Sequence, residues 1–130
     1  MMIRWGVLAL ALAAPAGGRA DPTLECGIGL GSQVEIGDCL AATEARVDET
    51  VAQALGFAME GAKALDAETG RPGAVPALEA GQAAWSAFRD AHCAFVGASF
   101  GGGSGTGAAI RACRIDLGRE RVGVLMGFAG

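Results

Sequence analysis

Residues 82–93 have the sequence QAAWSAFRDAHC, and this stretch decides which kind of fold the chain can form. Around it, five apolar or aromatic side chains recur at steps of seven, three, four and three residues, namely Leu78, Trp85, Phe88, His92 and Phe95. Such steps place side chains on one face of an α-helix. Pro76 suits the first turn, where its missing N–H group is not needed. The pattern predicts a helix from about Val75 whose aromatic face supplies the centre of the core.

A longer helix is predicted upstream of this one. Ser32 and Glu35 form an S-x-x-E capping box, in which each side chain bonds the other residue's backbone N–H. Apolar residues then follow at steps of four, seven, four, four and four, namely Ile36, Leu40, Val47, Val51, Leu55 and Met59. We therefore expect a helix from about Gln33 to about Leu65. A connector with two glycines and a proline follows at residues 66–74.

Beyond residue 98 the sequence SFGGGSGTG, residues 99–107, excludes a helix because of its glycine content. Helical character returns from Ala108 to about Phe128. The side chains expected to face inward there are Ile110, Cys113, Leu117, Val124 and Leu125. Residues 21–31 are expected to be irregular, and no alternation long enough for a strand is present. The sequence thus predicts an all-α bundle of three main helices.

The first twenty residues have the features of a cleaved secretory signal peptide. Arg4 precedes an apolar run at residues 5–14, and small residues follow up to Ala20. The run is too short to span a bilayer, which needs about 20 residues. Cleavage is expected after Ala20, with Ala16 as the second choice and an uncleaved anchor as the alternative. Residues 21–130 would then form a single helical domain in the periplasm or outside the cell, with no membrane span.

Signal cleavage would remove Arg4 and Arg19 and no acidic residue, which takes the net charge from −4 to −6. Nucleic acids attract basic surfaces, so an acidic domain of this kind is not expected to bind them. Such a charge suits a cationic partner instead.

Four cysteines remain after cleavage, namely Cys26, Cys39, Cys93 and Cys113. An even count in an exported chain predicts disulfides, and four cysteines allow three pairings. We favour Cys26 with Cys39 and Cys93 with Cys113 because each pair closes a short loop, although sequence alone leaves the pairing open. The chain has no C-x-x-C motif and one histidine, so neither a metal site nor a cofactor is expected.

The order Q-x-x-W-x-x-F-R-D-x-x-C at residues 82–93, followed by Cys113 and by an arginine eight residues later, resembles the lysozyme inhibitor LprI-like N-terminal domain family. The resemblance extends from about Cys26 to Leu125. Its motif residues here are Gln82, Trp85, Phe88, Arg89, Asp90 and Arg121. Gly118 stands where the family usually has a threonine. The resemblance implies a protein partner, and inhibition of lysozyme is an activity of a few family members.

The motif residues are expected to be structural. Trp85 lies on the predicted apolar face, and Arg89 is expected to pair with an acid of the first helix such as Asp48. Asp90 is expected to support the following loop. A general base needs a nucleophile or substrate group within hydrogen-bond reach and usually an orienting acid, a geometry that the sequence does not show. A single histidine beside a disulfide cysteine, like His92, is more often structural, so no catalytic residue and no enzymatic activity are predicted.

The glycine-rich loop is the candidate partner-binding segment, made of Ser99, Phe100, Gly101, Gly102, Gly103, Ser104, Gly105 and Thr106. A disulfide between Cys93 and Cys113 would hold it, and a rigid loop enters an enzyme cleft at low entropic cost. A flexible connector is the alternative. A basic cluster follows at Arg111, Arg114, Arg119 and Arg121, expected to balance nearby acids such as Asp116 and Glu120 rather than to bind an anion.

Two functional hypotheses follow from these observations. The first is an exported helical binding protein that inhibits lysozyme by occluding its cleft. The alternative is a periplasmic adaptor or structural protein that binds another envelope protein and has no effect on lysozyme. The sequence leaves open the partner, the oligomeric state and the choice between periplasm and extracellular space.

Overall fold

The computed structural model describes residues 20–130, which form four α-helices and, within that range, no strand. The helices are α1 (Pro22–Gly27), α2 (Gln33–Thr69), α3 (Ala74–Ala98) and α4 (Thr106–Met126). The all-α prediction is confirmed, and both favoured disulfides, Cys26–Cys39 and Cys93–Cys113, are present. The predicted signal peptide lies outside the described residues.

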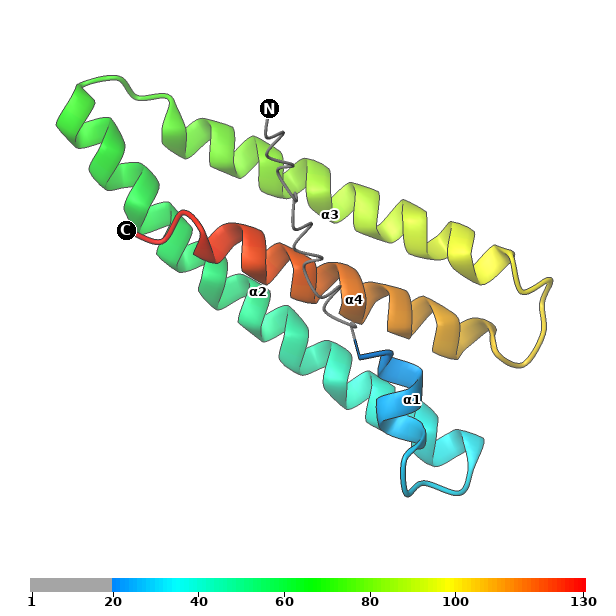
Figure 1. Cartoon of the computed structure of the whole chain (residues 1–130). Helices are drawn as coiled ribbons and strands as arrows, with labels where there is room; N and C mark the ends of the chain where they lie inside the picture. Colours follow the sequence, from blue (N-terminus) through cyan, green and yellow to red (C-terminus); the bar gives the residue numbers. More distant parts are fainter. Residues whose placement is uncertain (1–19) are drawn as a thin grey trace, which may run out of the picture.

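Helix α4 lies between α2 and α3, and α2, the longest helix, runs the length of the molecule (Figure 1). Helix α4 also contacts α1, which packs beside the first turns of α2. The glycine-rich loop and the α2–α3 connector lie at opposite ends of the bundle (Figure 1). The bundle therefore presents two long outer helices and two distinct ends.

The short helix α1 was not expected, because residues 21–31 were predicted to be irregular. Asp21 caps it by accepting a hydrogen bond from the N–H of Thr23 at 2.8 Å, and Pro22 occupies the first turn. These are the usual residues of a helix start. The Cys26–Cys39 disulfide then fastens this six-residue helix to α2, which explains how so short a helix is retained.

Helix α2 begins as predicted and ends later than predicted. The Glu35 N–H donates to Ser32 Oγ at 3.1 Å, and the Ser32 N–H donates to Glu35 at 3.0 Å, which completes the capping box. The helix continues to Thr69 rather than stopping near Leu65, and Gly70 ends it with a φ of 65°. A left-handed glycine is a common helix terminator, and it decides the boundary here.

The buried core forms two clusters along α2. One contains Val51, Ala54, Ala58 and Leu125, and the other contains Cys26, Leu40 and Ile115. Leu40, Val51 and Leu125 confirm the predicted inward faces. Val124 was wrongly placed inward, since 51% of it is exposed, whereas Ile115 is fully buried and was missed.

The predicted core face of α3 is the main error. Leu78 and Trp85 do pack against the core, but Phe88 and Phe95 are 53% and 68% exposed and His92 is exposed as well. The residues that face inward are Arg89 and Cys93, each one position along from an expected core residue. Because neighbouring residues on a helix point about 100° apart, both sets cannot face the core.

Gly118 lies where α4 packs tightly against α2. A Cβ atom placed on this residue would lie 2.4 Å from Cγ1 of Val47 and 3.3 Å from a guanidinium nitrogen of Arg89. The threonine that the family usually has at this position would not fit beside Val47. Gly118 and Val47 are therefore complementary in size.

We predict that Gly118→Ala lowers the free energy of unfolding by about 1–3 kcal/mol, the usual cost of overpacking a core. Gly123→Ala, on the same helix with open space around it, is the control. That control should be neutral or stabilising, because alanine favours helix more than glycine does. Urea denaturation of both variants gives the comparison.

The cause can be tested in a Val47→Ala background, where the clash is removed. There Gly118→Ala should cost less, with a coupling of about 1 kcal/mol between the two sites. Equal costs in the two backgrounds would show that Val47 does not set the constraint at Gly118.

Asp66 caps helix α3 from a different helix. Gly73 at the helix start provides no side chain, and the N–H groups of Gly73, Ala74 and Val75 donate to the Asp66 carboxylate at 3.1, 2.8 and 3.1 Å. These hydrogen bonds, led by the one from Ala74, lower the pKa of Asp66 below its ordinary value of 3.8. One carboxylate near the end of α2 thus orients the start of α3.

The contribution of Asp66 to stability should depend on pH. Its pKa is lower in the folded chain than in the unfolded chain, so the contribution is complete above the ordinary pKa and is lost as pH falls through the lowered one. The difference in unfolding free energy between the wild type and Asp66→Ala should therefore shrink in acid. Glu68→Ala, which removes a charge from the same turn, is the control. A wild-type advantage over Asp66→Ala that persists unchanged at pH of about 2 would contradict this capping role.

Candidate functional site

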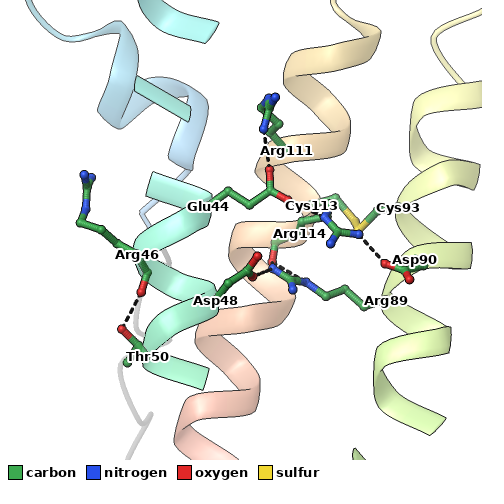
Figure 2. A network of polar contacts seen from close by, with 10 residues as sticks. All are labelled: Glu44, Arg46, Asp48, Thr50, Arg89, Asp90, Cys93, Arg111, Cys113 and Arg114. Atoms are coloured by element: carbon green, nitrogen blue, oxygen red, sulfur yellow. Dashed lines mark hydrogen bonds and ion pairs between the residues drawn. A yellow bond between two sulfur atoms is a disulfide. The ribbon is translucent and has the colours of Figure 1, made fainter. Parts of the chain in front are cut away.

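The guanidinium group of Arg89 joins three helices. Its side chain extends from α3 and donates from Nε and a terminal nitrogen to the carbonyl oxygen of Arg114 in α4, at 3.0 and 2.6 Å. The same terminal nitrogen lies 2.7 Å from Asp48 of α2 (Figure 2). Arg89 is only 6% exposed, so these partners offset the cost of removing its guanidinium group from water. The expected pairing of Arg89 with Asp48 is present.

Two guanidinium groups lie close to the ring of Trp85. The guanidinium carbon of Arg89 is 5.3 Å from the centre of its ring, and that of Arg121 is 5.7 Å away. Both distances are within the range of cation–π contacts. Arg121 also donates to the side-chain oxygen of Gln82 at 2.9 Å. Four of the motif residues thus meet at the α3–α4 interface.

A second cluster of ion pairs lies one helical turn nearer the glycine-rich loop. Glu44 of α2 accepts from Arg111 at 2.8 Å and from Arg114 at 2.6 Å, and Arg114 also binds Asp90 of α3 (Figure 2). Hydrogen bonds to Asp90 and then to Glu44 raise the pKa of Arg114, which stays charged. Asp90 therefore acts through Arg114 to tie α3 to α4 just before the loop.

Three arginines of α4 pair with acids on other helices, namely Arg111, Arg114 and Arg119. Arg119 makes a two-pronged contact with Glu25 of α1, each distance 2.8 Å. The hydrogen bond from Arg119 lowers the pKa of Glu25, so the pair persists into moderately acidic solution. The sequence indicated that nearby acids balance these arginines, but it did not show the acidic partners that three of them have on α1, α2 and α3. Arg121 bonds the amide of Gln82 instead.

Of the six motif residues, only Phe88 lies on the exposed surface among apolar neighbours. Gln82, Trp85, Arg89 and Arg121 make the interior contacts described above, and Asp90 makes its contact from a largely exposed position. The motif therefore describes how α3 is seated on α2 and α4. It does not by itself mark a binding surface.

The candidate loop lies directly beyond these contacts of α3 with α2 and α4. Cys93 and Cys113 close the α3–α4 hairpin with Cα atoms 5.6 Å apart, and the loop follows outside the disulfide. Gly101 and Gly102 have φ angles of 62° and 80°, which other residues rarely adopt. The turn therefore requires glycine at these two positions.

The loop has internal hydrogen bonds that define its shape. The N–H of Gly103 donates to the Phe100 carbonyl at 3.1 Å, and the Thr106 N–H and hydroxyl donate to the Gly103 carbonyl at 3.1 and 2.8 Å. The ring of Phe100 packs against Gly105. With its ends fixed by the disulfide, the loop is built as a compact turn.

A groove of about 360 Å³ separates the loop from the start of α2. Gln33, Gly37 and Asp38 line one side, and Ser104, Gly107 and Arg111 line the other. The groove is open to solvent and has both polar and apolar lining residues. The candidate site is thus the loop end of the bundle: residues 99–106, the groove and the first turns of α2.

The charge of the described chain is concentrated on α2. This helix carries eight acidic residues and only Arg46 and Lys63 as basic ones. Glu44 and Asp48 are committed to arginines of the interior network, whereas Glu35, Asp38 and Glu49 are exposed. The loop end therefore lies beside an acidic helix.

Two further properties concern residues 20–130 alone. None of their helices is long and apolar enough to cross a membrane. In the same range, no three His, Cys, Asp or Glu side chains gather in a way that could hold a metal ion.

Comparison with known proteins gives a family but no individual relative. No curated protein and no solved structure matches the chain. The family model described as lysozyme inhibitor LprI matches residues 27–125, which include the motif, the loop and three of the four cysteines. The match covers most of the sequence, so this chain belongs to the lysozyme inhibitor LprI family.

Proposed function

We propose that the protein is exported and inhibits a lysozyme-type muramidase by blocking its substrate cleft. The family match over residues 27–125 carries this proposal. The blocking surface would be the loop end, with residues 99–106 entering or covering the cleft. The mechanism is steric and needs no catalytic residue.

The shape of the loop supports this role. It is fixed at its base by Cys93–Cys113 and internally by the bonds around Gly103. A preorganised loop loses little conformational entropy on binding, so more of the contact energy appears as affinity. Disulfides of this kind also suit an oxidising compartment, which supports export to the periplasm or the medium.

The charge distribution supports a basic partner. Exposed carboxylates of Glu35 and Asp38 lie on the helix that forms one wall of the groove. Many lysozymes are strongly basic, and opposite charges speed the encounter of two proteins. Arg111 on the other wall is paired with Glu44 and does not reverse this balance.

A periplasmic adaptor that binds another envelope protein is the second candidate. The long exposed face of α3 favours it, since that face has no role in a loop-mediated inhibitor. An adaptor would leave lysozyme unaffected, so one assay separates the two candidates.

We predict that the oxidised exported chain inhibits lysis of peptidoglycan by a basic c-type lysozyme. Inhibition should weaken when ionic strength rises from about 0.01 M to about 0.15 M, because the Debye length falls from about 30 Å to about 8 Å. Absence of inhibition by folded, disulfide-bonded protein would remove c-type lysozyme as the target. Inhibition that is unaffected by salt would contradict only the role assigned to charge.

The loop can be tested by Ser104→Arg, which adds bulk and positive charge at the groove. We expect it to raise the inhibition constant at least about tenfold, a loss of about 1.4 kcal/mol. Ala67→Arg, an equal change of charge on exposed α2 at the far end of the bundle, is the control. Equal effects of the two substitutions would show that the loop end is not the inhibitory surface.

A further inference from the structure

The exposed face of α3 has the residue spacing of a coiled-coil seam. Seven small or apolar residues recur at alternating steps of four and three, namely Ala77, Gly81, Ala84, Phe88, Ala91, Phe95 and Ala98. All seven are exposed. This alternation is the heptad repeat, in which the seam residues of one helix pack against another helix. Nothing in the described fold occupies this seam.

The positions that flank the seam carry no Asp, Glu, Lys or Arg side chain. Ala80, Ala87 and Ala94 lie on one side of it, and Leu78, Trp85, His92 and Ser99 lie on the other. The charged residues of α3 lie elsewhere on the helix, with Arg89 buried in the interior network. A basic enzyme would therefore find no complementary charge on this face. A second neutral helix would fit it.

Residue size along the seam indicates which helix fits. The small residues Ala77, Gly81 and Ala84 lie in the first half, and Phe88 and Phe95 lie in the second half. If two copies of α3 run antiparallel, Phe88 of one copy lies against Ala84 of the other, and Phe95 lies against Ala77. Gly81 then meets Ala91, so every large residue has a small partner.

A parallel pair would be packed less well. It would place Phe88 on Phe88 and Phe95 on Phe95, and it would leave Gly81 facing Gly81 across a gap. Interiors are close-packed, and alternating overfilled and empty layers cost free energy. The antiparallel arrangement also opposes the two helix dipoles and closes as a twofold dimer.

We propose that the protein forms an antiparallel homodimer through the outer face of α3. The seam spans about 32 Å at 1.5 Å per residue, and the four phenylalanine rings of a dimer are each more than half exposed in the single chain. Alanine fills most of the other seam positions, so the dimer is of low affinity. The two glycine loops point to opposite ends of the dimer and both stay accessible.

The test is sedimentation equilibrium of the exported, oxidised chain, with its N-terminus identified by mass spectrometry, from about 10 µM to about 1 mM. The wild type should change reversibly from one to two times the monomer mass. Ala84→Glu, which sets a carboxylate against Phe88 of the second copy, should raise the dissociation constant at least about tenfold. Ala83→Glu, an equally exposed neighbour outside the seam, should leave it unchanged within about twofold. Circular dichroism checks that both variants are folded.

The register has its own test. Ala84→Phe should weaken the dimer by setting two phenylalanines in one layer, and Phe88→Ala should weaken it by leaving a gap. The double variant Ala84→Phe/Phe88→Ala restores one large and one small residue per layer and should recover dimerisation. Non-specific apolar association would instead be strengthened by Ala84→Phe.

Several results would overturn the proposal. These are a wild type that remains monomeric throughout, equal effects of Ala83→Glu and Ala84→Glu, or species larger than a dimer. A chain that dimerises only after loss of residues 1–20 would show that its own N-terminal segment covers the seam before export. The proposal would then hold for the exported form of the protein. A chain that stays monomeric both with and without residues 1–20 would contradict the proposed dimer.

Discussion

The buried guanidinium of Arg89 is the interaction on which the arrangement of the helices depends. It extends from α3, binds a backbone carbonyl of α4 and pairs with Asp48 of α2, so three helices meet at one side chain. A buried charge is costly unless its partners are in place, which makes the relative positions of these helices specific. Gly118, which has no side chain, leaves space for the side chains of Arg89 and Val47. The same constraint fixes the rotation of α3 about its axis, and therefore which residues of α3 face outward.

Local signals in the sequence were sufficient for most of the helices. The capping box at Ser32, the first-turn position of Pro76 and the glycines of residues 99–107 each act within a few residues, and the structure has the expected boundaries nearby. The short α1 carried similar signals at Asp21 and Pro22, but its six residues have no apolar periodicity to reveal it. The pairing of Arg89 with Asp48 could be foreseen from the motif, because a charged residue in an apolar stretch needs a partner.

Other features could not be predicted because they depend on contacts between distant residues. Asp66 caps a helix that begins several residues later, and Glu25 pairs with Arg119 from the other end of the chain. The inward face of α3 was misassigned for a related reason. Hydrophobic spacing shows that a helix has an apolar face, but not whether that face meets its own core or a second molecule. Phe88 and Phe95 satisfy the spacing of a core and lie on the surface.

The position of α4 between α2 and α3 separates the two outer helices and what they can do. Helix α2 carries most of the acidic residues and forms one wall of the groove beside the loop, whereas the seam of α3 and its flanking positions carry no Asp, Glu, Lys or Arg. A cationic partner at the loop end and a neutral helix on α3 would therefore not compete for the same surface. The contacts of Arg89 fix the outer face of α3 relative to the loop end. An antiparallel dimer through α3 would therefore present its two loops in opposite directions. Two partner molecules could then be bound at once without any further change in the fold.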